Sequence, residues 1–595
     1  MTAPPSESQP PDSPDPDSPD PDSPSPDSPS LESRPTGTAE LSIGPVLRRV
    51  AGTTATLWLE TTAPARVRVE VEGGGGGATP TFSAYGHHYA VVIVEGLTPG
   101  AACRYQVFLD ERPAWPPADS GYPPSAIHTR AADDADHPVS LIFGSCREAT
   151  PQATTRHLPP DALDAYARRL MRDPSQRPDL IVLLGDQVYA DNTSDKVQRF
   201  LRRNRRPGHH GPDDEVISFD EYTRLYHESW RDPEVRWLFA TVPAVMIFDD
   251  HEIIDDWNTS DSWRRDMSGK AWWRERISAG LASYWVYQHL GNLSPEEIRD
   301  DPLYQKIMAA GDATDLLHDF GLSVDDPSEA ENTDQPYRWS FSLDLGRTRL
   351  VMLDNRCNRV LTSGDRRMLP RAEWDWFVER AQGDYDHLVI GSSLPWLMPP
   401  AIHHLEAWNE RMAESSGRRR AAFAEKLRRA FDLEHWAAFT RSFEALGELF
   451  RRLGAGRTAT PGALVGTGDG SRAPASINVL SGDVHHSYVA RVDLGPGTAT
   501  PVHQLTCSPI HNQVPRPMRP LMRFSWSRAA AKGVRGLGRA SGVEPPGWQW
   551  TRVAGPYFGN AISTLRLEGV SASVRVEETD TDGSLCTAAD VLLRD

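Results

Sequence analysis

Short apolar runs that end in polar, chemically versatile side chains recur along this 595-residue chain. The clearest run is Leu180–Leu184, which follows a polar turn at 175–179 and precedes Gly185 and Asp186. An apolar run bounded by turn residues predicts a buried strand. Because Gly185 permits a tight turn, we expect Asp186 at the carboxyl end of this strand, where open α/β sheets bind ligands. A lone Gly-Asp pair more often caps the next element, so the interpretation depends on the other runs.

Five further runs show the same arrangement of an apolar stretch followed by polar groups. They are residues 139–143 before Cys146 and Arg147, 242–248 before Asp250 and His251, 350–353 before Asp354 and Arg356, 387–390 before Ser392, and 477–480 before Asp483 and His485. An amphipathic helix is predicted over residues 161–171, between the first two strands. Strands that alternate with helical stretches indicate an α/β architecture.

Composition and charge exclude some classes of function. The net charge is −19, and residues 1–34 alone hold eight Asp or Glu against one Arg. A globally acidic protein is a poor candidate for non-specific DNA binding, so no specific nucleic acid partner is predicted. No apolar run has the length of a membrane span, and the N-terminus lacks the basic region and apolar core of a secretory signal. Five widely spaced cysteines fit a reducing cytoplasm, so we expect a cytoplasmic location.

The N-terminal part of the chain divides into two segments. Residues 1–35, with Pro-Asp-Ser repeats, are predicted to form an acidic disordered tail that keeps the protein soluble or, alternatively, binds a partner. Residues 38–130 contain alternating strand patterns, such as Arg66–Val71, and a glycine loop at 73–77. These patterns predict a small antiparallel β-sandwich, immunoglobulin-like or fibronectin type III-like, without catalytic groups.

The segment 401–453 is helical, charged and rich in arginine around residues 418–420. We interpret it as an insertion that packs over the sheet or acts as a lid. The segment 199–210 is also basic. Both basic stretches are more simply explained as solvated faces, and the alternative is a positive rim that attracts an anionic substrate.

Six residues at the predicted strand ends supply the groups of a metal centre: Cys146, Asp186, Tyr189, Asp250, Asp483 and His485. An oxygen-rich half and a half with thiolate, phenolate and imidazole would favour two different ions, which Asp186 could bridge. Two ions would lower the pKa of bound water and steady the oxygens of an in-line phosphoryl displacement. Taken singly, Cys146 and Tyr189 are more simply interpreted as core residues.

Three further residues are candidates for catalysis. His251 follows Asp250 directly and could act as the general acid, oriented by Glu252 or Asp255. Arg147 and Arg356 could hold phosphoryl oxygens with their guanidinium groups. For Arg356 the alternative is an ion pair with a nearby acid such as Asp354.

Taken together, these motifs resemble the PhoD-like (alkaline phosphatase D) family of the calcineurin-like metallophosphoesterase superfamily. The motifs are residues 144–147, 185–189, 249–252, 354–356 and 481–485. The resemblance covers roughly residues 38–570 and implies a four-layer αββα sandwich with a dinuclear metal site. In this family Cys146, Asp186, Tyr189 and His485 would bind a ferric ion. The second ion would be calcium, held by Asp186, Asp250 and Asp483, with magnesium, manganese or zinc as alternatives.

We therefore expect an α/β metallophosphoesterase that hydrolyses phosphomonoesters or phosphodiesters by attack of a metal-bound hydroxide. The catalytic domain is predicted over residues 137–570, with a C-terminal extension at 571–595. Its partner would be a small phosphate ester, and the oligomeric state is open. Members of the family are commonly exported, in contrast to the cytoplasmic location expected above. The alternative function is a non-catalytic scaffold with a degenerate phosphatase fold.

Overall fold

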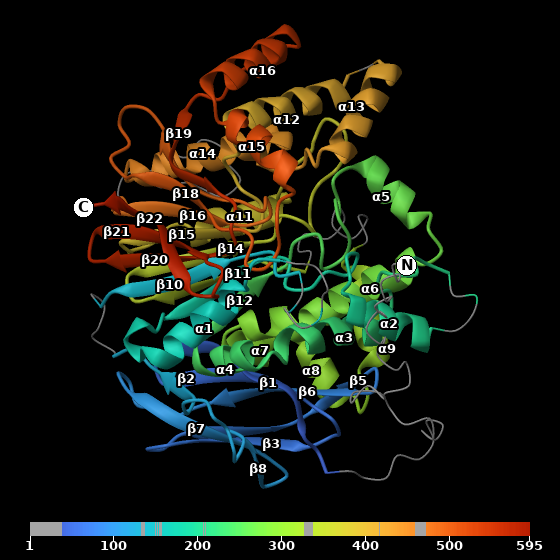
Figure 1. Ribbon diagram of the computed structural model, residues 1–595, viewed down its shortest axis with the longest axis vertical. Coiled ribbons are helices and arrows are strands. Elements are labelled where there is room, and N and C mark those ends of the chain that lie inside the picture. The colour runs from blue at the N-terminus through green and yellow to red at the C-terminus, as the bar shows by residue number, and fades with distance from the viewer. Residues whose placement is uncertain are drawn as a thin grey trace, which may run out of the picture. The chain divides into compact units, whose positions relative to one another are not determined.

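The structure is a computed structural model that describes residues 38–131, 137–148, 150, 153, 158–205, 208, 210–325, 337–415, 417–457 and 472–595 (Figure 1). The compact unit considered below begins at Ala39. The predicted N-terminal tail at 1–35 lies outside the described residues. None of the described helices is both long and apolar enough to cross a membrane.

The N-terminal domain consists of two antiparallel sheets. The first has the order β1 (Leu41–Ala51), β2 (Thr54–Thr61), β6 (His87–Val94) and β5 (Phe82–Ala84). The second has the order β4 (Gly76–Pro80), β3 (Arg66–Val71), β7 (Ala102–Leu109) and β8 (Arg112–Trp115), with β9 (Ala126–His128) beside β7. This confirms a β-rich N-terminal domain, although Gly76 and Gly77 of the predicted loop belong to β4. Its identity as immunoglobulin-like or fibronectin type III-like stays a prediction.

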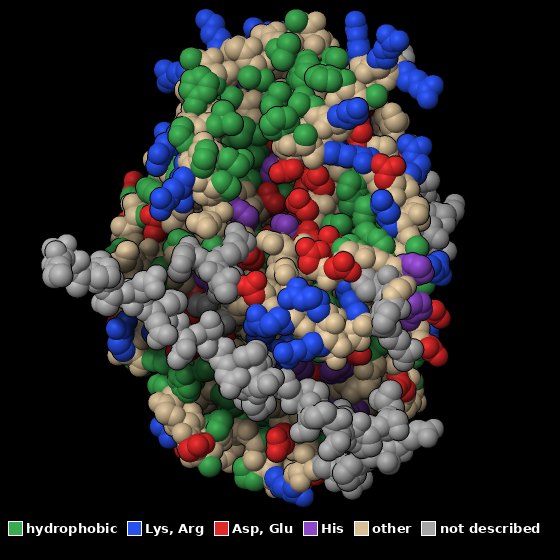
Figure 2. Space-filling model, turned by 45° about the vertical axis from the view of Figure 1, so that its right-hand side comes forward, with side chains coloured by type: hydrophobic (Ala, Val, Ile, Leu, Met, Phe, Trp, Pro, Cys, Tyr) green, Lys and Arg blue, Asp and Glu red, His purple; other side chains and the backbone are tan. Residues whose placement is uncertain are grey.

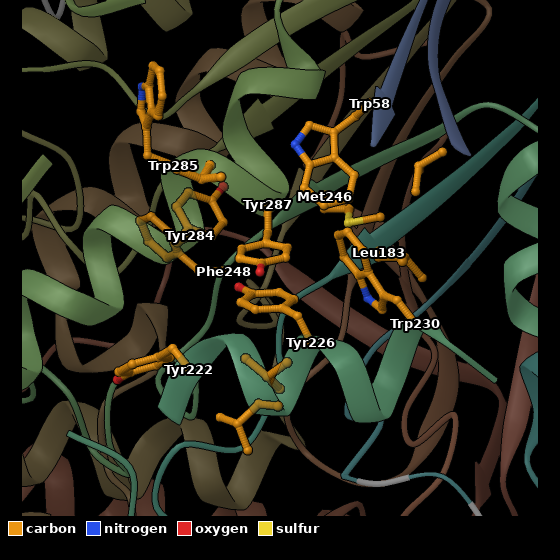
Figure 3. Close-up of a cluster of buried hydrophobic side chains, with 14 of the residues drawn as sticks. Trp58, Leu183, Tyr222, Tyr226, Trp230, Met246, Phe248, Tyr284, Trp285 and Tyr287 are labelled. Carbon is orange, nitrogen blue, oxygen red and sulfur yellow. The ribbon is translucent and has the colours of Figure 1, made fainter. Parts of the chain in front are cut away.

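Strand β2 serves two hydrophobic cores because successive side chains of a strand point to opposite faces. Leu57 and Leu59 belong to the core between the two N-terminal sheets. Trp58 points the other way and packs against Trp230 and Tyr287, with ring centroids 5.7 and 5.2 Å away. Figure 3 shows Trp58 among these aromatic side chains of the neighbouring domain. The small domain therefore shares a core with the larger one.

A six-stranded mixed sheet carries the first three predicted strand ends. Its order is β12 (Ala244–Ile247), β11 (Leu180–Leu184), β10 (Val139–Gly144), β20 (Ala561–Glu568), β21 (Ser571–Thr579) and β22 (Leu585–Arg594). Strands β10, β11 and β12 are parallel, whereas β20, β21 and β22 are antiparallel to their neighbours. The segment 571–595, expected as a C-terminal extension, supplies the two outer strands of this sheet.

A seven-stranded sheet carries the remaining strand ends. Its order is β13 (Phe341–Leu345), β14 (Thr348–Leu353), β15 (His387–Ser392), β16 (Ser476–Ser481), β18 (Val502–Thr506), β17 (Ser487–Asp493) and β19 (Gln549–Tyr557). Strands β14, β15, β16 and β18 are parallel. Because parallel neighbours end at the same edge, the loops after β14, β15 and β16 lie together.

Helices flank the sheets in two groups. The first group is α1 (Ala162–Arg172), α2 (Asp195–Asn204), α3 (Phe219–Trp230), α4 (Pro233–Thr241), α5 (Asp261–Ser268), α6 (Trp273–Tyr284), α7 (Pro295–Asp300), α8 (Pro302–Ala309) and α9 (Thr314–Ser323). The second group is α11 (Arg371–Arg380), α12 (Pro400–Ala413), α13 (Arg418–Ala430), α14 (Thr440–Gly454), α15 (Arg519–Ser525) and α16 (Arg528–Ala540). The predicted helix at 161–171 is confirmed as α1, and the side chain of Asp161 caps it by accepting from the backbone N–H of Leu163.

Three hydrophobic cores connect these elements. One core joins strands of the six-stranded sheet to strands of the seven-stranded sheet, for example Leu184 and Val389. A second core joins the six-stranded sheet to the first group of helices. A third core joins the seven-stranded sheet to α11 and α14. The mixed α/β class is thereby confirmed. Figure 1 shows α12, α13, α15 and α16 gathered at the end of the molecule opposite the N-terminal sheets.

Candidate metal centre

The loops that follow the strands of both sheets are joined by backbone hydrogen bonds. The N–H of Arg147, after β10, donates to the carbonyl oxygen of Asp186, after β11, over 3.0 Å. The N–H of Gly482, after β16, donates to the carbonyl of Ser393, after β15, over 2.8 Å. The side-chain hydroxyl of Ser145 links the two sheets, because it accepts from the N–H of Asp483 over 3.2 Å. The predicted strand ends therefore do converge on one region.

Four of the six predicted metal ligands have left-handed backbone conformations. The φ angles are +60° at Cys146, +54° at Asp186, +66° at Asp483 and +50° at His485. Non-glycine residues rarely adopt this region, and each such residue costs on the order of 1–3 kcal/mol. A cost of this kind persists where the surrounding structure enforces it, and such residues concentrate at functional sites.

Asp186 is buried and only partly satisfied by protein contacts. Its Oδ2 accepts a hydrogen bond from the hydroxyl of Tyr189 over 3.3 Å, and the amide of Asn512 donates to the same hydroxyl oxygen over 3.3 Å. Its Oδ1 has no hydrogen-bond partner among the described residues. Burial, followed by nearby carboxylates, raises the pKa of Asp186 well above its usual value despite the opposing charge of His251. A bound cation would offset the cost of ionising this buried carboxylate.

Cys146 lies in the same buried region. Its sulfur is 3.1 Å from the hydroxyl of Ser145 and 3.2 Å from the hydroxyl of Ser508. Burial, with the charges of Asp186 and Asp483, raises the pKa of the thiol well above its usual value. A bound metal ion would favour the thiolate of Cys146.

Three groups of side chains in the described part of the chain have ligand atoms close enough to hold a metal ion. One of them, Glu60, His87 and His227, includes residues of β2 and β6 in the N-terminal domain. The other two lie at the strand ends. Asp186, Asp250 and His251 form one group, and Asp249, Asp250 and Asp483 form the other, with all ligand atoms of each group within 4.8 Å. Asp250 belongs to both groups. Cys146 and His485 fall outside these two groups.

Arg356 lies among the acidic side chains instead of facing solvent. Its guanidinium forms a short ion pair with Asp249 through Nε and another with Glu434. It also lies 3.4 Å from Oδ1 of Asp250 and 3.5 Å from Oδ1 of Asp483. The expected partner Asp354 instead accepts backbone N–H groups, including that of Arg356 over 2.8 Å. Arg356 therefore contacts all three carboxylates of the second candidate group, two of which belong to the predicted ligand set.

The side chain of Arg147 does not lie among these carboxylates. Its Nε donates to Asp161 over 2.7 Å, and a terminal nitrogen donates to the carbonyl of Ser229 over 2.9 Å. The side chain is 1% exposed. The structure therefore places Arg147 in an internal ion pair at the start of α1, and its predicted contact with phosphoryl oxygens stays a prediction.

A carboxylate and an aromatic ring fix the position of His251. Its Nδ1 lies 2.8 Å from Oδ1 of Asp191, and its ring stacks on Tyr189 with centroids 4.3 Å apart. Its Nε2 lies 3.9 Å from Asp255, and the side chain is 18% exposed. Burial opposes protonation, but the nearby carboxylates, led by Asp191, raise the pKa of His251 well above its usual value. A protonated, partly exposed imidazole of this kind can act as an acid.

Glu252 does not orient His251 as one prediction proposed. Its carboxylate accepts the backbone N–H groups of Asp186, Gln187 and Asp249 over 3.0, 2.8 and 2.9 Å. One buried carboxylate therefore holds the backbone that follows β11 and the backbone that follows β12. The residue that holds His251 is Asp191, five positions after Asp186, which the strand-end pattern did not single out.

Acidic and histidine side chains gather in the middle of one face of the molecule (Figure 2). Asp483 and His251 are partly accessible to solvent, because 19% and 18% of their side-chain surfaces are exposed. Small polar molecules can therefore reach the candidate centre from solvent.

The family comparison agrees with this geometry. The sequence model of the PhoD-like phosphatase family matches residues 152–362. Residues 152–362 therefore form a domain that matches the PhoD-like phosphatase family. The matched range includes Asp186, Tyr189, Asp250, His251 and Arg356, whereas Cys146, Asp483 and His485 lie outside it.

Comparison with solved structures places the PhoD-like domain in a known fold. A protein described as "Structure of PhoD" aligns with a TM-score of 0.54 and 12% identity, over 95% of this chain and 90% of that chain. The crystal structure of a maltogenic amylase from S. marinus reaches a TM-score of 0.15 at 7% identity, over 94% of this chain and 83% of that one. A family described as a domain of unknown function, DUF7800, matches residues 38–127. A comparison with curated proteins gives no match.

The donor set of the candidate centre fits metal ions. Oδ1 of Asp186 and Oδ2 of Asp249 are buried oxygens without a hydrogen-bond partner among the described residues. Unpaired buried carboxylate oxygens are costly, and a coordinated cation would satisfy them. Carboxylates with thiolate, phenolate and imidazole nearby form a mixed hard and soft set.

The 401–453 segment contributes to the candidate centre, which the sequence pattern did not predict. Between α13 and a short turn at Trp436–Ala438, Glu434 and His435 enter the buried region. Nε2 of His435 lies 3.0 Å from Oδ2 of Asp483, and Nδ1 lies 2.9 Å from Glu406 on α12. A Glu-His pair next to an apolar turn was the available signal, but it resembles many ordinary helix ends.

Proposed function

We propose that the chain hydrolyses phosphate esters, monoesters or diesters, with the help of two metal ions. The observation that carries this proposal is that the carboxylates of Asp186, Asp250 and Asp483 supply ligand atoms to two adjoining candidate groups. Cys146, Asp186, Tyr189 and His485 are proposed for an iron site, and Asp186, Asp250 and Asp483 for a second ion, with calcium the expected metal. When bound, the two ions would acidify a coordinated water and offset charge on the phosphoryl group.

The chain's own residues would supply orientation and a proton. His251, held through Nδ1 by Asp191, keeps Nε2 available for the leaving oxygen of the ester. Although burial opposes protonation, the neighbouring carboxylates, led by Asp191, raise the pKa of His251 and so favour its protonated form, which suits a general acid. Arg356 is fully buried and ion-paired, and this supports a role in fixing Asp249, Asp250 and Asp483. Its predicted contact with phosphoryl oxygens stays a prediction.

The order of the three hydrophobic cores supports the four-layer αββα arrangement expected of such an enzyme. Each pair of parallel strands places its loops at one edge, where open α/β sheets bind ligands. The hydrogen bond between Ser145 and Asp483 connects the loops of the two sheets at this edge.

Elemental analysis of the purified protein, with a visible absorption spectrum of the same sample, tests the metal centre. Stoichiometric iron with a broad visible band that disappears in Tyr189→Phe would support a tyrosinate–iron(III) site. Two zinc or manganese ions without colour would leave the phosphoesterase in place and assign structural roles to Tyr189 and Cys146. Absence of metal uptake on reconstitution would instead support the scaffold hypothesis.

The Asp186→Asn variant tests the assignment of the site. We expect it to lose metal and activity toward both mono- and bis-p-nitrophenyl phosphate, whose comparison separates monoesterase from diesterase activity. Asp493→Asn, at an exposed position at the end of β17, is the matched control. Full activity of Asp186→Asn would show that the assigned site is wrong.

A further inference from the structure

The helices at the end of the molecule opposite the N-terminal sheets carry an unusual surface. Between Asp493 and Glu544 the sequence contains no Asp or Glu, although the net charge of the whole chain is −19. The same stretch contains seven basic residues, namely Arg516, Arg519, Arg523, Arg528, Lys532, Arg535 and Arg539. None of the seven forms a salt bridge with a carboxylate in the described part of the chain. Six of the seven lie on α15 and α16 and Arg516 lies just before them, so the positive charge of these helices is not offset by carboxylates of the same stretch.

Large apolar side chains are exposed on the same stretch. Met518, Leu521 and Phe524 are spaced three residues apart and are 47%, 64% and 57% exposed. Residues three apart on a helical turn lie on one face, so these three form a row beside α16. Leu537 on α16 is 46% exposed. Apolar side chains scattered singly need no explanation, but a row rimmed by charge marks an interaction surface.

Helix α13 extends this surface on the other side of α12. Helix α12 packs against both α13 and α16, as shown by hydrogen bonds from Asn409 to Ala424 and from Trp408 to Ser541. Phe423 on α13 and Phe431 after it are 57% and 63% exposed. Figure 2 shows hydrophobic side chains over this end of the molecule, with Lys and Arg side chains at its margins.

We propose that the α15–α16 surface docks on a bilayer of anionic phospholipids. An amphipathic helical surface with basic residues around apolar side chains lies in the membrane interface, where apolar groups enter the acyl boundary and basic groups meet acidic headgroups. A second copy of this chain would bring two sets of seven cations together. A nucleic acid would use the basic residues but leave Leu521 and Phe524 in water.

Figure 2 shows hydrophobic side chains at one end of the face in whose middle acidic and histidine side chains gather. The docking itself does not rest on hydrolysis, so it is measured with metal chelated and the full chain intact.

Vesicle flotation tests the proposal. We expect the full chain to float with vesicles of equal parts phosphatidylglycerol and phosphatidylcholine, and not with phosphatidylcholine alone. Leu521→Glu combined with Phe524→Glu should weaken the binding at least tenfold. Leu592→Glu is the matched control, because Leu592 on β22 is also an exposed leucine, at 61%, and it should bind like the wild type.

The contribution of the basic residues on α16 is tested separately. Arg528→Glu combined with Lys532→Glu, at two exposed positions of α16, should weaken binding and reduce its dependence on salt. Unchanged hydrolysis of soluble p-nitrophenyl esters by all these variants would show that the fold and the centre are intact. A loss of soluble activity would mean that the variants disturb the domain. Vesicle binding by Pro515→Glu, at an exposed residue before α15, would then be measured instead. Weakened binding would support the proposal, and undiminished binding would overturn it.

Several outcomes would overturn the proposal. These are no flotation with anionic vesicles, equal flotation with neutral vesicles, or undiminished flotation of the Leu521 and Phe524 double variant. Self-association of the wild type that the double variant abolishes would assign the surface to a second copy. Displacement from vesicles by duplex DNA that binds the double variant equally well would assign it to nucleic acid.

Discussion

Nε2 of His435 lies 3.0 Å from Oδ2 of Asp483, and the other nitrogen of the ring lies 2.9 Å from Oε1 of Glu406. The three side chains form a line from α12 to the loop after β16. Burial opposes protonation of His435, but Glu406 and Asp483 raise its pKa well above the usual value. Burial would also raise the pKa of Asp483, yet the hydrogen bond from His435 and the charges nearby lower it to about 2. His435 therefore keeps Asp483 ionised and oriented.

Replacement of His435 should weaken metal binding at the second candidate site. Loss of an outer hydrogen-bond partner of a metal ligand typically costs about 10–100-fold in metal affinity or activity. We expect a loss of that size in metal affinity for His435→Phe and partial recovery for His435→Gln, which can still donate to Asp483. Metal titration followed by tryptophan fluorescence would measure it. His503→Gln, at a buried position of β18, is the control and should leave metal affinity unchanged.

His251→Ala should retain metal and slow esters with poor leaving groups more than activated aryl esters. The reason is that an acid matters most when the leaving oxygen is basic. The comparison of kcat for an alkyl phosphate and for p-nitrophenyl phosphate measures this. Asp191→Asn should show the same pattern more weakly, because the imidazole would lose the carboxylate that raises its pKa. Equal slowing of both esters would argue against an acid role.

Gly185→Ala should destabilise the protein strongly. Gly185 has φ of +97°, and a Cβ atom there would lie 2.5 Å from Cβ of Asp249. We expect a loss of about 2–4 kcal/mol in the free energy of unfolding, from steric overlap and backbone strain together. Urea denaturation would measure it. Gly52→Ala is the control, since Gly52 has φ of +56° but a Cβ atom there would have no neighbour within 4 Å, so it should lose about 1 kcal/mol from strain alone.

The contact between the two domains should depend on pH through His87. Its Nδ1 lies 3.2 Å from Glu60, and its Nε2 lies 3.2 Å from Asp220. Burial opposes protonation, but the hydrogen bonds to Asp220 and Glu60 raise the pKa of His87 from 6.5 to about 9. A raised folded-state pKa stabilises fully below pH 6.5, and the stabilisation is lost as pH rises through about 9.

The His87→Gln variant tests this pH dependence. Because the side chain is 25% exposed, we expect a loss of about 1–2 kcal/mol below pH 6.5. The difference in thermal midpoint between wild type and variant should shrink to near zero above pH 9. His210→Gln, at an exposed position, is the control. A constant difference across the pH range would show that the ion pair is not responsible.

Strand positions were predictable because burial on both faces leaves a continuous apolar run. The prediction of Leu180–Leu184 is confirmed at both ends, and the other five runs correspond to β10, β12, β14, β15 and β16. Asp186, Tyr189, Asp250 and Asp483 were accessible to the same reasoning because each follows such a run. The outer strands at 571–595 were not, because their alternation gives no information about which sheet edge they join.

Contacts set by long-range packing could not be predicted. The sequence suggested Asp354 as the partner of Arg356, because the two are neighbours, whereas the structure pairs Arg356 with Asp249 and Glu434. Arg147 pairs with Asp161 only because α1 begins beside the loop after β10. Pairings of this kind depend on how separate elements are brought together, which local patterns do not encode.

The aromatic core around Trp58 has a consequence for how this protein can be divided. Since one face of β2 completes the hydrophobic interior of the larger domain, neither part can be exchanged or trimmed as an independent cassette. A fragment that starts at residue 137 would present a bare aromatic face to water and would be prone to precipitate. Exchange of one domain would therefore require a replacement whose aromatic residues match this packing.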